Sequence, residues 1–96
     1  MKIDLLTLYN YRNYNNLNLK LSSNINIFTG FNAQGKTNII ESIFLCSMGK
    51  SFRAKKDKEM IKINEDICSV EVEYEKSDRE GKIKIEIGNK KNIFIN

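Results

Sequence analysis

The chain contains no histidine, and this absence removes several classes of enzyme at once. Without histidine, neither a Ser-His-Asp nor a Cys-His catalytic centre can form within these 96 residues, and the usual zinc sites are also excluded. Only two cysteines are present, Cys46 and Cys68, and they lie 22 residues apart without a metal-binding spacing. We therefore expect two reduced, buried thiols of a cytoplasmic protein.

Long apolar runs are also absent. The longest, residues 43–46, is four residues long, whereas a membrane-spanning helix needs roughly 20. Residues 1–4 include an acid and precede no apolar stretch that ends in small residues, so we expect no signal peptide and no membrane contact. The composition, 41% hydrophobic and 29% charged, is typical of one small globular domain or a piece of a larger one.

The net charge of +4 is concentrated in one segment, residues 50–62. This basic segment contains six bases and two acids, whereas the other 83 residues contain ten of each. One interpretation is a surface for nucleic acid or nucleotide phosphates, with Arg53, Lys55 and Lys56 as candidate DNA contacts. The other is a solvated loop or short helix whose lysines face water. The charge pattern leaves both interpretations open.

Hydrophobic periodicity predicts a sheet with one main helix. Apolar residues spaced by three and four predict a helix over residues 36–48. The acids of residues 70–75 are expected to face the lysines of residues 82–87 across an antiparallel hairpin with a loop over residues 77–81. Residues 10–16 are turn-rich and are expected to stay exposed. Strands are expected at 3–9, 17–21, 25–29, 70–75, 82–87 and 92–95.

One motif carries most of the functional information. Residues 30–37 read Gly-Phe-Asn-Ala-Gln-Gly-Lys-Thr and fit the phosphate-binding loop G-x-x-x-x-G-K-[ST], with a predicted strand before them and a predicted helix after them. Gly30 and Gly35 let the chain wrap closely around a phosphate, and backbone N–H groups point inward at the positive end of the following helix. Lys36 is expected to reach the β- and γ-phosphates, and the Thr37 hydroxyl to ligate Mg²⁺. The predicted ATP contacts in this motif are Gly30, Phe31, Asn32, Ala33, Gln34, Gly35, Lys36 and Thr37.

Further stretches on both sides of this motif match one family of P-loop proteins. The matching stretches are 10–14, 24–38, 41–43, 50–53 and 56–61. They closely resemble the opening of the RecF family of bacterial DNA replication and repair proteins. The sequence Asn-Ala-Gln-Gly-Lys-Thr-Asn over residues 32–38 is characteristic of that family within the wider class of SMC proteins and ABC ATPases. One departure is Phe52, where the family commonly carries histidine.

The periodicity and the resemblance together predict the fold. We expect an α/β fold of the ABC-ATPase head type, in which an antiparallel-rich sheet contains a P-loop strand and packs against one main helix, as an incomplete P-loop NTPase domain. The resemblance also implies that Arg12 and Asn13 approach the nucleotide from outside the loop, and that Ser51 and Arg53 lie near the nucleotide or a DNA-facing surface. The expected parts of this N-terminal unit, residues 1–96, are strands within 1–29, the P-loop 30–37, the helix 36–48, the basic segment 50–62 and strands within 67–95.

The resemblance further implies a function for the family. Such a protein binds ATP with Mg²⁺, forms a homodimer of heads around the nucleotide and binds DNA in an ATP-dependent way at gaps or junctions of single and double strands. The implied processes are recombinational repair and the SOS response, and the implied partners are RecR and RecO. Hydrolysis in this class needs an acidic pair after an apolar strand and a serine-glycine signature, neither of which occurs in this sequence. We therefore expect weak nucleotide binding without turnover.

Two alternatives stay open from the sequence. The first is a different P-loop NTPase, such as a transporter ATPase or a nucleotide kinase. The second is a nucleic-acid-binding module without nucleotide chemistry, which would depend on residues 50–62 alone.

Overall fold

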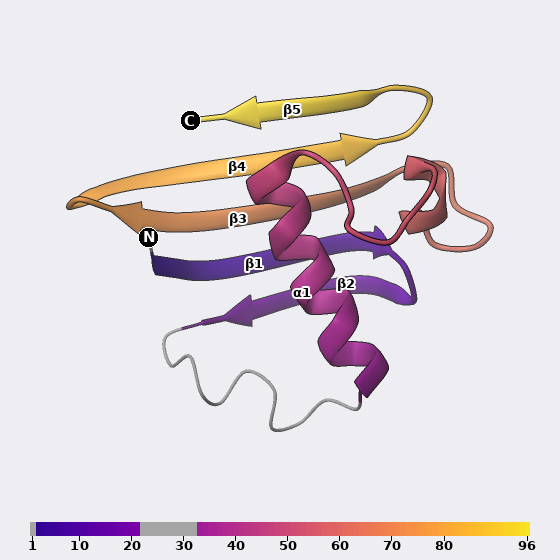
Figure 1. The fold of residues 1–96 in the computed structure, drawn as a ribbon, viewed down its shortest axis with the longest axis horizontal. Helices are drawn as coiled ribbons and strands as arrows, with labels where there is room; N and C mark the ends of the chain where they lie inside the picture. Colours follow the sequence, from indigo (N-terminus) through magenta and orange to yellow (C-terminus); the bar gives the residue numbers. More distant parts are fainter. Residues whose placement is uncertain (1, 22–32) are drawn as a thin grey trace.

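The computed structural model describes residues 2–21 and 33–96, which form one antiparallel sheet with a helix across one face (Figure 1). Five strands pair in the order β2-β1-β3-β4-β5, so β1 lies between β2 and β3. The predicted α/β fold with an antiparallel sheet is confirmed, and the predicted strand 25–29 lies outside the described residues. The elements in chain order are β1 (Lys2–Tyr11), β2 (Tyr14–Lys20), α1 (Ala33–Met48), the 3₁₀ helix η2 (Asp57–Met60), β3 (Cys68–Lys76), β4 (Arg79–Ile87) and β5 (Lys91–Ile95).

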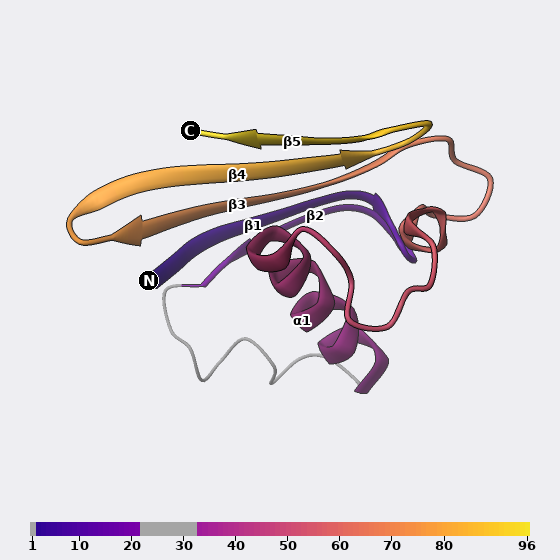
Figure 2. The ribbon, with the colours of Figure 1, turned by 45° about the horizontal axis from the view of Figure 1, so that its top comes forward.

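The core lies between α1 and one face of the sheet (Figure 2). The central strands β1, β3 and β4 bury alternate side chains toward the helix, as a period of two requires. Burial of apolar surface contributes about 25 cal/mol per Å². Among the described elements, no helix is both long enough and apolar enough to cross a membrane. The main buried apolar side chains are Leu6 and Leu8 of β1, Val70 and Val72 of β3, Ile85 and Ile87 of β4, and Ile39 and Leu45 of α1.

Both cysteines belong to this core. Cys46 of α1 and Cys68 of β3 are buried and not bonded to each other, as the sequence predicts. Burial raises the pKa of each thiol to about 12. Both side chains therefore stay protonated near neutral pH and act as small apolar groups.

The β3–β4 hairpin follows the predicted charge pattern. Glu71 lies opposite Lys84 on the outer face of the sheet, and Lys82 Nζ lies 3.2 Å from the Glu71 carboxylate. The loop, however, is shorter than the predicted 77–81 and consists of two residues, Ser77 and Asp78. Gly81 lies within β4 and pairs with Tyr74 of β3. A Cβ at this position would collide with the tyrosine ring, so a glycine fits there.

The turn of this hairpin has backbone angles that its residues do not favour. Ser77 and Asp78 have φ of 52° and 65°, as in a type I′ turn, for which Asn-Gly is the preferred pair. We expect the double substitution Ser77→Asn with Asp78→Gly to raise the free energy of unfolding by about 1 kcal/mol in urea denaturation. The control is Asp78→Ala, which keeps a Cβ at the strained position and should not raise the free energy of unfolding. A loss of stability in the double variant would contradict the turn assignment.

The turn between β1 and β2 is also shorter than predicted. Residues 10–16 are not all exposed, because Asn10 and Tyr11 are buried and only Arg12 and Asn13 separate the two strands. Positive φ angles at Asn10 and Arg12 allow this tight reversal. The 3₁₀ helix η2 stabilises the turn, since the Arg12 N–H donates to the Met60 carbonyl at 2.8 Å. The turn is thereby fixed beside α1 and η2.

Helix α1 begins earlier than the predicted residue 36. It starts at Ala33, so residues 33–35 of the predicted loop belong to its first turn. Alanine and glutamine favour helix, and a periodicity of large apolar residues cannot detect them as a helix start. The helix ends at Met48. The helix is closed by Gly49, at φ 78°, and by Lys91 Nζ, which donates to the Gly49 carbonyl at 2.8 Å.

Candidate functional site

The predicted phosphate loop is described only in its second half. Gly30, Phe31 and Asn32 lie outside the described residues. Ala33, Gln34 and Lys36 are exposed in the first turns of α1. The N-terminal end of a helix carries a partial positive charge, which favours anions. The described motif residues therefore lie where a phosphate-binding helix start is expected.

Thr37, the predicted magnesium ligand, is partly buried in α1. Its hydroxyl donates to the Ala33 carbonyl one turn earlier, at 3.0 Å. This is the usual bond of a threonine inside a helix. It uses the hydroxyl hydrogen, so the lone pairs of the oxygen remain for a metal ion. No cluster of three or more acidic, histidine or cysteine ligands occurs in residues 2–21 and 33–96.

The β1–β2 turn and the start of α1 form a cavity of about 380 Å³. The structure thus brings together predicted site residues from two separate parts of the sequence, Arg12 and Asn13 on one side and Gln34 on the other. Asn38 ties the two sides together, since its Nδ2 donates to Asn13 Oδ1 at 3.1 Å. The residues lining the cavity are Arg12, Asn13, Gln34, Asn38, Glu59, Ile61 and Ile63.

Next to this cavity, Glu41 of α1 forms the centre of a buried polar cluster. Its side chain has no exposed surface, and both carboxylate oxygens accept several hydrogen bonds. Arg12 donates from Nε to Oε1 at 2.9 Å and from Nη2 to Oε2 at 2.7 Å. Arg53 donates from Nε to Oε2 at 3.0 Å, and the Ser51 hydroxyl donates to the same oxygen at 2.6 Å. The buried Tyr11 hydroxyl donates to Oε1. A buried carboxylate this fully bonded is charged and rigidly held.

The electrostatics of the Glu41 cluster follow from these bonds. Burial alone raises the pKa of the Glu41 carboxyl, but the hydrogen bonds, led by those from Arg12 and Arg53, outweigh it and lower the pKa to about 2. The hydrogen bond to Glu41 raises the pKa of Arg12. Burial, and then the bond to Glu41, raises the pKa of the Tyr11 hydroxyl well above its usual range. The cluster is therefore one anion between two cations throughout the neutral pH range.

Sequence reasoning did not identify Glu41 as a site residue. An acid in a helix is usually solvated, and the cations that neutralise Glu41 come from the β1–β2 turn and from the segment after α1. The one sequence feature that could have indicated the burial of Glu41 is its position on the helix. Residue 41 shares a face with residues 38 and 45, which are buried.

The basic segment divides into two parts. Ser51 and Arg53 turn toward Glu41, and Arg53 Nη2 also donates to Asn38 Oδ1. Lys55 and Lys56 are exposed. Phe52, at the departure from the family pattern, stacks on Phe44 of α1 with ring centroids 5.3 Å apart and helps to hold the segment on the helix.

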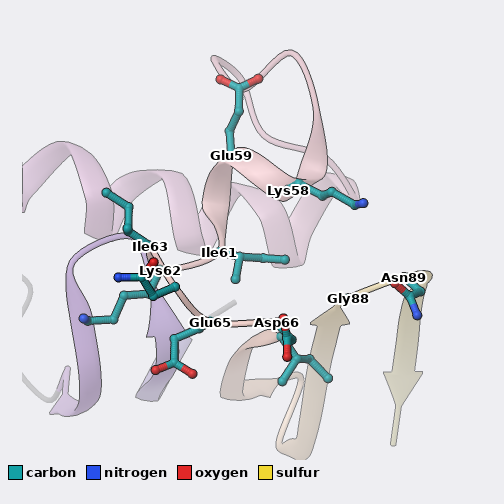
Figure 3. Close-up of a pocket in the computed structure, with 11 residues that line it drawn as sticks. Lys58, Glu59, Ile61, Lys62, Ile63, Glu65, Asp66, Gly88 and Asn89 are labelled. Atoms are coloured by element: carbon teal, nitrogen blue, oxygen red, sulfur yellow. The ribbon is translucent and has the colours of Figure 1, made fainter.

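A larger cavity of about 870 Å³ lies beyond η2, at one end of the sheet (Figure 3). Charged side chains of both signs line it. The close-up shows Lys58, Lys62 and Glu65 pointing in different directions, so the charged groups do not converge on a common ligand position (Figure 3). The smaller cavity beside Arg12 is the better candidate site, because it is next to the phosphate motif.

Comparisons with known proteins show which family the chain resembles. A family model described as "AAA domain" matches residues 5–95. Two curated relatives are the DNA replication and repair protein RecF of Clostridium acetobutylicum, 49% identical, and that of Clostridium novyi (strain NT), 51% identical, each over all of this chain. A solved structure of the recombination mediator protein RecF-ATP in the RecFOR pathway superposes with a TM-score of 0.83 and 31% identity over 99% of this chain. The resemblance to the RecF family is thereby confirmed.

The compared proteins are much longer than this chain. The chain spans 27% of each of the two curated relatives and 26% of the solved RecF-ATP structure. The matched part includes the phosphate motif, the β1–β2 turn and the Glu41 cluster, because the alignments cover all or nearly all of residues 1–96.

Proposed function

Since the chain belongs to the AAA domain family, we propose that it binds the phosphates of ATP where residues 30–37 meet the turn of Arg12 and Asn13. The single observation that carries this proposal is that one cavity joins Arg12, Asn13 and Gln34. A motif of the phosphate-binding type continues into the positive end of α1 at this cavity, and a guanidinium group lies across from it.

Mg²⁺ is the expected companion of the triphosphate. Thr37 is the residue of the motif that would ligate it, and the ion would neutralise phosphate charge. The Thr37 hydroxyl donates to the Ala33 carbonyl, and this leaves the oxygen lone pairs for the ion.

We extend the proposal to the biology of the relatives, which are named as DNA replication and repair proteins. The chain would be the ATP-binding portion of a cytoplasmic RecF-like protein whose heads dimerise on nucleotide and bind DNA at gaps or junctions, with RecR and RecO as partners. In the predicted DNA set, Lys55 and Lys56 are exposed, whereas the Arg53 guanidinium is held by Glu41 and Asn38. The two lysines are therefore the better DNA candidates.

The alternatives have less support. The curated relatives reported above are RecF proteins that match along the whole chain, which favours neither a transporter ATPase nor a nucleotide kinase. A nucleic-acid module without nucleotide chemistry would leave unexplained the phosphate motif and the cavity that Arg12 and Gln34 both line.

Lys36→Ala tests the proposal. The substitution removes a charged contact to phosphate, so we expect Mg-ATP affinity to fall by about thirtyfold to a hundredfold in a fluorescent-nucleotide titration. Lys50→Ala, which removes an exposed lysine just after α1, is the matched control and should change the affinity by less than about twofold. AMP, which lacks the β- and γ-phosphates, should compete poorly.

Two results would contradict the proposed function. One is equal ATP affinity in wild type and Lys36→Ala. The other is equal affinity for ATP and AMP, which would indicate recognition of the base without the phosphates. A change confined to salt-dependent DNA affinity would favour the nucleic-acid module instead.

A further inference from the structure

The Glu41 cluster contains more positive charges than negative ones. One carboxylate faces two guanidinium groups, and Nη2 of Arg12 and Nε of Arg53 lie 2.7 and 3.0 Å from the same oxygen, Oε2. The two cations repel each other because both contact the same oxygen, and the cluster retains a net charge of +1. A carboxylate that only stabilised the fold would need one partner, and apolar residues of similar volume often serve equally well in such a place.

One of the two cations, Arg12, lines the cavity beside the phosphate motif. Its side chain is 22% exposed although Glu41 has no exposed surface. A guanidinium has five N–H donors, and within the described part of the chain Arg12 uses three of them, two on Glu41 and one on the Glu59 carbonyl. Arg12 donors therefore remain for an anion in the cavity, which is also lined by Glu59, whose carboxylate accepts from the Lys56 N–H at 2.8 Å.

We propose that Glu41 is a positioning residue for the nucleotide: its buried carboxylate fixes Arg12, with Arg53 beside it, in the orientation in which Arg12 meets a phosphate group of a nucleoside triphosphate. This inference rests on the proposed function, because the ligand it requires is the triphosphate of that site. The positioning operates through both segments that the carboxylate joins, the β1–β2 turn and the start of the basic segment. Pre-ordering these long side chains reduces the entropy lost on binding.

The geometry also explains why the carboxylate does not compete with the nucleotide. Both oxygens of Glu41 are already saturated by Arg12, Arg53, Ser51 and Tyr11, and the group lies inside the protein. A phosphate in the cavity would meet the outer side of the Arg12 guanidinium and would bring the cluster toward charge balance. The arginine can then bridge the carboxylate and the phosphate.

A first test uses the wild-type chain and the Nε–H signals of its three arginines in a ¹H–¹⁵N NMR spectrum. Arg79 lies in the β3–β4 hairpin, away from the cluster, and serves as an internal control. On addition of Mg-ATP we expect the Arg12 and Arg53 signals to shift and the Arg79 signal to stay. If the backbone amides of Lys36 and Thr37 shift while Arg12 and Arg53 do not move, the positioning role is overturned and the proposed function stands. If no signal moves, both fail.

A second test is a cycle of variants read out as Mg-ATP affinity. Glu41→Gln removes the charge but keeps the shape, and it should weaken binding about tenfold, as should Arg12→Ala. If Glu41 acts through Arg12, the double variant should bind within about twofold of Arg12→Ala alone. A multiplied loss of about a hundredfold would overturn the inference, because Glu41 would then act independently of Arg12. Should Glu41→Gln not fold, the wild-type NMR titration decides.

Discussion

Replacing Glu41 with alanine is expected to lower the free energy of unfolding by about 3–5 kcal/mol. The substitution leaves the guanidinium groups of Arg12 and Arg53 facing each other without the anion between them. It also removes the acceptor of the buried Tyr11 hydroxyl. Three segments meet at this carboxylate, so the β1–β2 turn, α1 and the start of the basic segment should loosen together.

Urea unfolding followed by circular dichroism measures this effect. Glu65→Ala is the matched control, since Glu65 is an exposed acid in the segment after η2, and its stability should stay within about 0.5 kcal/mol of wild type. A loss of less than about 1 kcal/mol for Glu41→Ala would contradict the account of Glu41 as the centre of a tightly bonded cluster.

Acid should destabilise the protein through the same carboxylate. Burial opposes the charged form of Glu41, but hydrogen bonds led by those from Arg12 and Arg53 lower its pKa from 4.5 to about 2. Because the folded pKa lies below the unfolded one, the stabilisation is fully present above about pH 4.5 and is lost as the pH falls through 2. The shift corresponds to about 3 kcal/mol at neutral pH.

The measurement compares the pH dependence of unfolding in wild type and Glu41→Gln. Other acids also bind protons in this range, so the informative quantity is the difference between the two profiles. We expect the stability gap between the proteins to shrink by about 3 kcal/mol from neutral pH to about pH 2. The pH profile of unfolding of the control variant Glu65→Gln should run parallel to that of wild type. A gap that does not change with pH would show that Glu41 is not charged in the folded state.

The sheet could be predicted from sequence because its signal is local. Val70 and Val72 alternate with Glu71 and Glu73, so one face of β3 had to be apolar and the other charged. The pairing with β4 followed from the lysines that alternate in the next stretch, and the observed register places Glu71 opposite Lys84.

The ends of the elements were harder to predict because distant residues determine them. β1 continues to Tyr11 since residue 61 bridges to it, and the Lys62 N–H donates to the Asn10 carbonyl at 2.8 Å. No pattern near residue 11 announces a partner so far along the chain. The same holds for Glu41, whose burial depends on cations from two other segments.

The candidate site could be predicted where its chemistry is contiguous. Residues 30–37 identify a phosphate ligand by themselves, because glycine, lysine and threonine at fixed spacing each have a physical role there. Arg12 and Asn13 were predicted only through the family resemblance, and the structure places them on the cavity that Gln34 also lines. The cluster around Glu41 that orients Arg12 could be identified only from the three-dimensional structure, because its members come from separate segments.

A crystal structure of the chain with Mg²⁺ and a non-hydrolysable ATP analogue tests the central claim most directly. The account predicts phosphate groups against residues 30–37, with the Arg12 guanidinium in contact with the nucleotide and still bonded to Glu41. An analogue bound in the larger cavity beyond η2, with no phosphate against residues 30–37, would contradict it.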